Sequence, residues 1–575
     1  MLLSHLRIEN YRGIKLLELA LDETTVLVGE NNSGKTTVLH ALRACLNTLR
    51  ATGRAPPFDD FDLHFDNSAA DPTSAPPISI TLTFEESEPG TWSDEIDRQL
   101  GGDSGVVVLV APDDRSRIQL RVTASYSKVT QEVDTGFDFL DASGKPLPQK
   151  NRGRLSALQQ LRPLFYLSAL RDAGKEFSRT AQFWSPFVKN SQIDAATKAE
   201  IEEQLQAINA QIIEAHGTFK EVREHLSKVQ ALVALGEKDV VSVEAVPVRV
   251  FDMLNRTQVS IASVTGARLP IARHGEGTQS LTVLMLFDAF LKSELARKQG
   301  VKESAPIVAL EEPEAHLHPN AVRALWKTIA GINGQKLIAT HSGDLLSEVD
   351  IHSVRRLYRG KGGICVGYVP KGLFDERESQ KFDYWVRRTR GELYFARCWL
   401  LVEGETDVIL LTGGAKASGI DLEQSGVRII DYAQSDLGIF IKAADSLGIG
   451  WHVFSDGDAS GTKNVAKAKS VLDGRDDVKH ITLLPNGEPI EPWLCRSGFM
   501  DVYEEHASDQ NRPRCITVGK DDPAYAGQLF QCLPKNGKPA AAHAVVGVML
   551  KKGASSVPGE LKACLTKAIS LALEV

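Results

Sequence analysis

The N-terminal part of the chain alternates between apolar and polar residues in short segments. The apolar residues with this period are Leu6, Ile8, Leu17, Leu19 and Leu21. A two-residue period predicts strands, and the apolar run 25–28 that follows predicts a buried strand leading into a helix over 36–49. Residues 78–84 and 117–123 also alternate, so we expect strands of a half-exposed antiparallel sheet there.

Between residues 194 and 234 the apolar residues recur at helical spacing instead. They are Ile201, Leu205, Ile208 and Ile212, and then Phe219, Val222, Leu226 and Val229. The segment contains no proline and many Glu, Gln and Lys residues, which predicts a helical hairpin with two amphipathic faces. These faces could pack on their own domain or form a protruding dimerisation arm, and both interpretations stay open.

Strands and helices alternate again in the second half of the chain. One such region covers 245–360, and a further strand–helix unit begins near Cys398. The tail contains two helical patterns, 540–552 and 559–574. This alternation predicts the α/β class, and the glycine-rich loop 360–363 with the charged stretch 374–392 is the predicted linker.

Length and composition narrow the class of protein. A chain of 575 residues is too long for one hydrophobic core and suggests about three domains. Its 42% apolar and 24% charged residues exclude intrinsic disorder, collagen and a disulfide scaffold. The net charge of −8 excludes a generally basic nucleic-acid coat, but it leaves room for a local basic groove.

Cysteines and apolar runs indicate the compartment. None of the seven cysteines forms a CxxC pair, so a zinc ribbon is not expected, and free thiols suit a reducing cytoplasm. The sequence has neither a signal-peptide pattern nor the ~20-residue apolar run that spans a bilayer. We therefore expect a cytoplasmic protein without a membrane partner.

A glycine-rich loop joins the predicted strand 25–28 to the helix after it. Residues 29–36 fit the pattern GxxxxGK[ST] in the strand–loop–helix context that this pattern requires. The predicted nucleotide-binding residues are Gly29, Asn31, Asn32, Ser33, Gly34, Lys35, Thr36 and Thr37. Backbone N–H groups would cradle the phosphates, Lys35 would reach the β- and γ-phosphates, and Thr36 would hold Mg²⁺. The alternative is a chance match in a turn.

Two adjacent acids follow a second buried strand. Residues 306–310 are apolar, and Glu311 and Glu312 come directly after them, as in a Walker B site. Glu311 would help place Mg²⁺, and Glu312 would polarise the attacking water. Solvated surface charges are the alternative interpretation.

These motifs resemble those of ATP-binding-cassette ATPases. His341 ends a strand like the switch histidine of that family, and residues 273–281 occupy its signature position. Gly277 and Gln279 match the signature there, whereas Glu276 and Thr278 depart from it. Because the signature of one subunit completes the phosphate site of another, the resemblance implies a homodimer or a higher homo-oligomer. Residues 8–13 resemble the opening of the RecF and chromosome-maintenance ATPases, which act on DNA.

A second carboxylate site is predicted further along the chain. The run 400–407 is a strand followed by acids, and 451–458 is a strand that ends in DxD. Parallel strands would bring both ends to one sheet edge, where Glu403, Asp407, Asp456 and Asp458 would ligate metal. Clustered carboxylates repel one another unless cations neutralise them, which favours two Mg²⁺ or Mn²⁺ ions. Helix N-capping is the alternative for these acids.

The pair of turns resembles the Toprim domain, and this resemblance implies phosphodiester chemistry. About 105 residues follow position 470, too few for the cleavage domain of a topoisomerase, and a primase would carry a zinc ribbon. Metal-dependent hydrolysis remains, with Glu403, Asp456 and Asp458 as catalytic acids. Lys538 could stabilise charge on the scissile phosphate, and Glu491 could be a late acidic ligand. For each of these two, a solvated surface charge is an equal alternative.

An ABC-type ATPase followed by Toprim resembles the OLD (overcoming lysogenization defect) nuclease family and its Gabija anti-phage relatives. The predicted fold is α/β, a RecF/SMC-like P-loop ATPase domain with a helical insertion, followed by a C-terminal Toprim domain. The predicted domains are 1–190 and 241–375 for the ATPase, 191–240 for the dimerisation insert and 390–575 for the nuclease.

The resemblance implies ATP-regulated, Mg²⁺- or Mn²⁺-dependent cleavage of DNA in phage defence or DNA processing. Self-association and, for some members, a UvrD-like helicase partner are also implied. A RecF-like clamp with a non-cleaving Toprim domain and an RNA-cleaving nuclease are the alternatives. Four arginines ahead of the predicted acids could line a phosphate-binding groove or a solvated linker face: Arg387, Arg388, Arg390 and Arg397.

Overall fold

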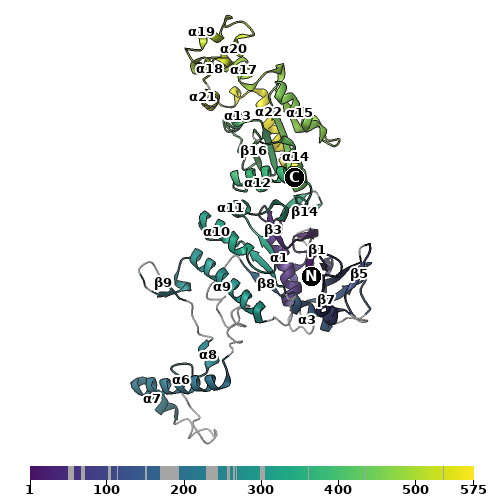
Figure 1. Ribbon diagram of the computed structural model, residues 1–575, viewed down its shortest axis with the longest axis vertical. Coiled ribbons are helices and arrows are strands. Elements are labelled where there is room, and N and C mark those ends of the chain that lie inside the picture. Colours follow the sequence, from purple (N-terminus) through teal and green to yellow (C-terminus); the bar gives the residue numbers. More distant parts are fainter. Residues whose placement is uncertain are drawn as a thin grey trace. The chain divides into compact units, whose positions relative to one another are not determined.

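The computed structural model (Figure 1) divides into two compact units. The first comprises Met1–Tyr166, Ile307–Glu312 and Gly334–Val575, and the second comprises Leu167–Pro306 and Pro313–Asn333. The four-segment domain division stays a prediction. The structure describes the chain except for residues 50–56, 66–70, 102–104, 113, 149–151, 169–192, 228–243, 255–259, 263–265, 267, 298–304, 361, 434, 535–536 and 575.

An antiparallel sheet opens the first unit. Its order is β2 (Ile14–Ala20), β1 (Leu2–Tyr11), β4 (Ile78–Glu85), β6 (Arg115–Ser127) and β5 (Val108–Val110), with β7 (Glu132–Leu140) also paired to β6. Alternate side chains such as Leu6 and Ile8 are fully buried, as the two-residue period predicts. The strands expected at 78–84 and 117–123 are confirmed as β4 and β6.

The nucleotide motifs lie on a second, largely parallel sheet. Its order is β14 (Gly363–Gly367), β13 (Val354–Gly360), β3 (Thr24–Gly29), β12 (Gln335–Ala339), β11 (Ile307–Glu311) and β8 (Leu164–Leu167). Strands β13, β3, β12 and β11 run parallel to one another, whereas β14 is antiparallel to β13, and α1 (Lys35–Arg43) follows β3. The carboxyl ends of β3, β11 and β12 therefore meet at one edge, where α/β sheets bind ligands.

A third sheet, entirely parallel, lies in the C-terminal part of the first unit. Its order is β16 (Val427–Asp431), β15 (Cys398–Val402), β17 (Gly450–Ser455) and β18 (Ile481–Leu483). Every residue of β15 is buried, as expected for a central strand covered on both faces. Its helices are α13 (Glu405–Ala417), α14 (Leu437–Leu447), α15 (Ala459–Ser470), α21 (Gly537–Lys552) and α22 (Gly559–Glu574).

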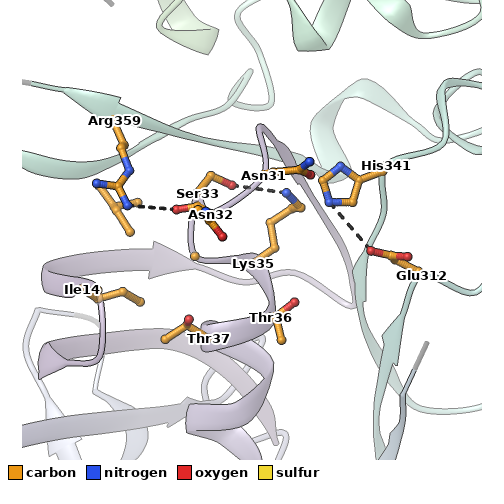
Figure 2. A pocket seen from close by; sticks show the side chains of 13 residues that line it. Ile14, Asn31, Asn32, Ser33, Lys35, Thr36, Thr37, Glu312, His341 and Arg359 are labelled. Atoms are coloured by element: carbon orange, nitrogen blue, oxygen red, sulfur yellow. Dashed lines mark hydrogen bonds and ion pairs between the residues drawn. The ribbon is translucent and has the colours of Figure 1, made fainter. Parts of the chain in front are cut away.

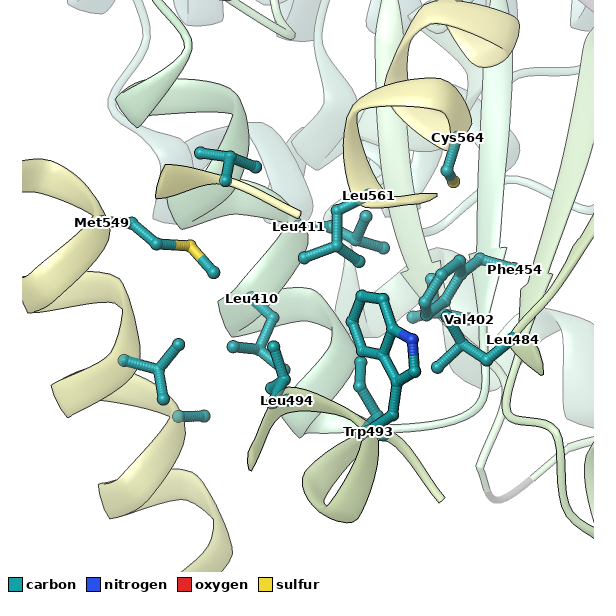
Figure 3. Close-up of a cluster of buried hydrophobic side chains, with 14 of the residues drawn as sticks. Val402, Leu410, Leu411, Phe454, Leu484, Trp493, Leu494, Met549, Leu561 and Cys564 are labelled. Atoms are coloured by element: carbon teal, nitrogen blue, oxygen red, sulfur yellow. The ribbon is translucent and has the colours of Figure 1, made fainter. Parts of the chain in front are cut away.

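A large apolar core fixes three of these helices, α13, α21 and α22, on the third sheet (Figure 3). Leu410 and Leu411 of α13 are fully buried in it together with Met549 of α21 and Leu561 of α22. Burial of each such side chain stabilises the fold by about 1.5–3 kcal/mol. The core thus holds the N-terminus of α13 in place, and that is where the predicted acids lie.

The second unit contains the two helices predicted between 194 and 234, as far as the structure describes them. They are α6 (Ala195–Ala215) and α7 (Gly217–Ser227), and residues 228–234 of the predicted hairpin lie outside the described residues (Figure 1). Ile208 and Val222 of the predicted apolar faces are 46% and 41% exposed. Val229 lies outside the described residues. The unit also contains α8 (Val250–Leu254), β9 (Ser260–Ala262), β10 (Arg268–Pro270), α9 (Glu276–Arg297) and α10 (Pro319–Ala330). None of the described helices is long and apolar enough to cross a bilayer.

Candidate functional site

The loop between β3 and α1 has the backbone of a phosphate cradle. Gly29 and Gly34 have φ angles of 144° and 98°, in the region that favours glycine. A Cβ atom at Gly29 would lie 2.1 Å from the carbonyl oxygen of Leu357 on β13, so no other residue fits there. The loop borders a cavity of about 680 Å³, shown in Figure 2.

Lys35 lies inside this cradle. Its Nζ atom donates to the carbonyl oxygens of Gly29 and Glu30, both at 2.8 Å, and to Ser33 Oγ at 3.3 Å. Burial lowers the pKa of Lys35 to about 8, against the opposing effect of Glu312 and Glu30, so the ammonium is still largely charged at neutral pH. Phosphate oxygens would give this buried cation the counter-charge that carbonyl groups lack.

The Walker-type acids face the same loop. Thr36 Oγ1 donates to Glu311 Oε1 at 2.6 Å, and the hydroxyl of Tyr166 donates to Glu311 Oε2 at 2.6 Å. His341 Nε2 lies 3.9 Å from Glu312 Oε1 (Figure 2). Burial, reinforced by Lys35, lowers the pKa of His341, which favours a neutral imidazole beside Glu312.

The structure therefore groups most of the predicted nucleotide residues. The predicted residues that line the cavity are Asn31, Asn32, Ser33, Gly34, Lys35, Thr36, Thr37, Glu312 and His341. Tyr166 was not found from the sequence, because nothing within β8 marks one tyrosine as facing an acid 145 positions away. Arg359, which donates to the carbonyl oxygen of Asn32 at 3.3 Å, was missed for the same reason.

The predicted signature residues belong to the second unit. Gly277 and Gln279 lie in the first turn of α9, where Gln279 Nε2 donates to the carbonyl oxygen of His274 at 2.7 Å. The Oε2 atom of Glu276, one of the two departures from the usual signature, lies 2.9 Å from His316 Nδ1. A role for Gly277 and Gln279 at a partner's phosphate site stays a prediction.

The second group of acids follows β15 and β17, which are neighbours in the third sheet. Glu403 comes directly after β15, and its carboxylate accepts from Ser460 Oγ at 3.0 Å and from Asn464 Nδ2 at 3.4 Å. Both donors lie on α15, the helix that follows the DxD turn after β17. These two positioning residues were not predicted, because their role depends on the pairing of strands about fifty residues apart.

Asp407 and Asp456 are the most perturbed carboxyl groups of this site. Burial, followed by repulsion from Asp456, raises the pKa of Asp407 well above its ordinary value. Burial and then repulsion from Glu491, Glu403 and Asp458 raise the pKa of Asp456 to about 7. The buried Oδ1 atom of Asp456 has no hydrogen-bond partner among the described residues. The described protein groups therefore neither neutralise the negative charge of the cluster nor donate a hydrogen bond to the Oδ1 atom of Asp456.

Helix capping occupies part of the same acid set. Asp407 Oδ2 accepts from the Gly404 N–H at 3.1 Å, and Asp458 Oδ1 accepts from the Gly461 N–H at 2.8 Å. These hydrogen bonds cap the N-termini of α13 and α15, as the helix-capping interpretation of the acids predicts. A Cβ atom at Gly461 would lie 1.9 Å from the carbonyl oxygen of Asp456, so glycine is required for this turn.

The donor set suits a hard divalent cation. Every candidate ligand is a carboxylate oxygen, which Mg²⁺ and Mn²⁺ prefer. The Asp456 oxygen without a hydrogen-bond partner has lone pairs available to a metal ion. Within the described ranges, no three Asp, Glu, His or Cys side chains converge closely enough to form a ready-made metal site.

The two late candidates lie beside the acids. Glu491 is 3% exposed, and Lys538 Nζ lies 3.3 Å from its carboxylate and 4.4 Å from the ring centre of Phe530. Lys538 belongs to α21, which begins at Gly537 and not at residue 540 as the sequence pattern suggested. A buried acid paired with this lysine excludes a solvated surface role for Glu491.

Two of the four arginines ahead of β15 have protein partners. Arg397 pairs with Glu30 of the phosphate loop, and Arg388 lies 3.4 Å from Asp431 and stacks on Trp385. Both guanidinium groups therefore have a carboxylate partner within the protein, and a phosphate-binding groove stays a prediction.

A P-loop site on one parallel sheet and an acid site on a second define the class, a P-loop ATPase core followed by a Toprim-type α/β domain. Residues 1–392 match the family described as "Protein of unknown function (DUF2813)", and the chain belongs to this family. Residues 394–458 match the Toprim domain of overcoming-lysogenization-defect-like proteins, which confirms the OLD resemblance.

Curated relatives cover most of the chain. The uncharacterized protein YbjD of Escherichia coli is 28% identical over all of this chain and 99% of its own length. The OLD nuclease of Thermus scotoductus is 25% identical over 80% of this chain and 82% of its own length. The endonuclease GajA of Bacillus cereus is 21% identical over 84% and 80%, respectively.

Two solved structures are distant matches. The C-terminal region of the Burkholderia pseudomallei OLD protein is 22% identical, with a TM-score of 0.26, and covers 31% of this chain and 99% of that one. The SMC head domain of Thermotoga maritima is 13% identical, with a TM-score of 0.30, and covers 64% of this chain and 99% of that one.

Proposed function

We propose that the chain is an ATP-regulated, divalent-metal-dependent DNA endonuclease. The observation that carries this proposal is the unsatisfied carboxylate cluster after β15 and β17, above all the partnerless Asp456 oxygen. A cluster of like charges is costly unless a cation neutralises it. The nuclease names of two relatives that match about four-fifths of the chain support the same function.

Glu403, Asp407, Asp456 and Asp458 would hold two Mg²⁺ or Mn²⁺ ions. Bound metal would supply a nucleophilic water at neutral pH and neutralise the phosphate. In the reaction, water forms a new bond to phosphorus while one P–O bond to deoxyribose breaks, leaving a phosphate monoester and a hydroxyl. Ser460 and Asn464 would keep Glu403 oriented, and Lys538 would stabilise the negative charge that develops on the phosphate.

The phosphate loop would bind ATP. Backbone N–H groups of the loop and Lys35 would hold the phosphates, Thr36 and Glu311 would hold the single Mg²⁺ that accompanies ATP, and Glu312 beside His341 would orient the hydrolytic water. Self-association through the signature residues and the helical hairpin, a UvrD-like helicase partner and a role in phage defence belong to the same proposal.

Cleavage of supercoiled plasmid tests the proposed function. The full-length chain is incubated with Mg²⁺ or Mn²⁺, with and without ATP, and compared with Asp456→Asn and with Asp521→Asn, the same substitution at an exposed site. We expect nicking or linearisation by the wild type and by Asp521→Asn, and none by Asp456→Asn. Plasmid cleavage that persists in Asp456→Asn would refute the assignment.

A DNA-binding ATPase clamp without cleavage is the second candidate function. The capping bonds of Asp407 and Asp458 favour it, because capping alone gives these two acids a structural use. ATP hydrolysis and DNA binding without cleavage of plasmid, single-stranded DNA or RNA would support the clamp.

A further inference from the structure

One acid of the phosphate loop points away from the nucleotide cavity's lysine and toward the Toprim part of the first unit. Glu30 follows Gly29, and its backbone carbonyl accepts from Lys35 Nζ at 2.8 Å and from the Ser33 N–H at 3.2 Å. Its side chain binds Arg397, with Nε–Oε1 and Nη2–Oε2 distances of 2.5 and 2.9 Å. The backbone of Glu30 thus belongs to the cradle while its carboxylate belongs to a second contact.

Arg397 lies at the amino end of the strands that carry the acids. Its N–H donates to the carbonyl oxygen of Gly426 at 2.8 Å, and its own carbonyl accepts from the Gly450 N–H at 2.8 Å. These bonds tie Arg397 to the starts of β16 and β17, and β15 begins at the next residue. Glu403 is six residues further on, about 20 Å along an extended strand. A displacement of Arg397 along the strand would therefore move the acid-bearing end.

The Glu30–Arg397 pair contributes little to folding. The two side chains are 46% and 41% exposed, and ion pairs at such exposure are screened by water. The contact lowers the pKa of Glu30 and raises the pKa of Arg397, so both groups are charged throughout the physiological range. Its bidentate geometry gives it directionality that a single contact lacks.

A second arginine supplies a fixed support beside this exposed pair. Arg356 of β13, 2% exposed, donates to the carbonyl oxygens of Tyr394, Ala396, Leu447 and Gly448 at 2.8–3.2 Å. Because β13 pairs with β3, this arginine joins the nucleotide sheet to the Toprim sheet. The buried arginine holds the two sheets together, and the exposed pair is free to respond to the loop.

We propose that the Glu30–Arg397 pair couples nucleotide binding in the cradle to the position of the Toprim acids, with Arg397 as a positioning residue. Phosphate oxygens compete with the Glu30 carbonyl for Lys35, and any resulting shift of Glu30 is passed through Arg397 to β15. The inference deepens the proposed function, since it names the contact through which ATP regulates cleavage.

Two readouts on the full-length chain test the coupling. The first is the ratio of plasmid cleavage rates with and without ATP. The second is hydrogen exchange of peptides covering 398–403 with and without a non-hydrolysable ATP analogue, which needs no cleavage. The variants are Arg397→Ala, Arg397→Lys and Glu30→Gln, and the control is Arg475→Ala. Arg475 forms an equally bidentate pair with Asp445, at 2.7 and 3.0 Å, with similar exposure.

We expect ATP to change the wild-type rate at least fivefold, in the range typical of coupled sites. Arg397→Ala should bring the ratio within twofold of one and remove the analogue's effect on exchange at 398–403. Arg397→Lys should keep part of the ATP effect on the cleavage rate and part of the analogue's effect on exchange. The double variant Glu30→Gln/Arg397→Ala should behave like Arg397→Ala alone, because both substitutions remove the same contact. Arg475→Ala should resemble the wild type.

A nucleotide effect on cleavage and exchange that survives Arg397→Ala would overturn the inference, as would an Arg475→Ala variant that loses it equally. A wild type whose cleavage and exchange ignore nucleotide would overturn it too. If the wild type does not cleave DNA but the nucleotide still changes hydrogen exchange at 398–403, and Arg397→Ala removes that change, the proposed nuclease function is refuted. The proposed coupling through Arg397 then still holds.

Discussion

Replacement of Asp456 by asparagine should stabilise the metal-free protein while it removes the proposed chemistry. Burial and the neighbouring acids, first Glu491, raise the pKa of Asp456 from its ordinary 3.8 to about 7. The folded chain therefore binds this proton more tightly than the unfolded chain does. It follows that stability falls as the pH rises from about 4 to about 7, and that the whole loss is present above pH 7.

The size of this effect follows from the pKa difference. At about 1.36 kcal/mol for each pH unit, the ionised Asp456 costs up to about 4 kcal/mol at pH 8. The residue is only half-buried, so water screens part of the repulsion and we expect about 2 kcal/mol. For a domain of about 150–250 residues, that corresponds to roughly 4–8 °C in the unfolding temperature.

Differential scanning fluorimetry in EDTA measures this gain. At pH 8 the unfolding temperature of Asp456→Asn should exceed that of the wild type, and at pH 4.5 the gain should shrink to about a quarter. Saturating Mn²⁺ should stabilise the wild type and remove the difference. Asp521→Asn, at an exposed position, should unfold like the wild type. An Asp456→Asn variant that is no more stable than the wild type at pH 8 in EDTA would refute the reasoning.

Three further substitutions test other contacts. Lys35→Ala should weaken binding of a fluorescent ATP analogue at least tenfold, because it removes the cation of the cradle, and an unchanged affinity would contradict that role. Tyr166→Phe should lower kcat for ATP hydrolysis about tenfold with little change in KM, since it removes one hydrogen bond to Glu311. Gly461→Ala should lower the unfolding temperature of the Toprim part by about 5 °C or more and remove its stabilisation by Mn²⁺, because the new methyl group collides with the carbonyl of Asp456. Normal melting of this variant would show that the turn accepts a side chain and would contradict the steric argument.

Features of this protein that depend on short sequence motifs could be predicted, whereas features that depend on contacts between distant residues could not. The glycine-rich loop, the acid pair after β11 and the two acid turns are short segments whose residue types already state a chemistry, and the structure brings each set to a sheet edge. Tyr166, Ser460 and Arg397 left no such signal. Each acts on a partner 57 to 367 positions away, and only strand order brings the partners together.

The contacts of the arginines before β15 also could not be predicted from the sequence. From the sequence, a cluster of four basic residues ahead of an acid site favours either a phosphate groove or a solvated face. The structure gives Arg397 a carboxylate of the phosphate loop instead, because β13 pairs with β3 and carries the loop to the start of the Toprim sheet. No local pattern distinguishes an arginine that faces DNA from one that faces a distant glutamate.

Capping and metal ligation are not exclusive interpretations of the Toprim acids. Asp407 and Asp458 each use one oxygen to accept a backbone N–H at the start of a helix. An ionised carboxylate has about four lone-pair sites on two oxygens, so a capping bond leaves most of them available. The capping bond also fixes the orientation of the group, as neighbouring hydrogen bonds do for metal ligands in general. Asp456 also accepts a backbone hydrogen bond, from Ile490, but its buried Oδ1 atom has no partner in the described part of the chain, and it is therefore the acid whose removal separates structural from chemical use of the site.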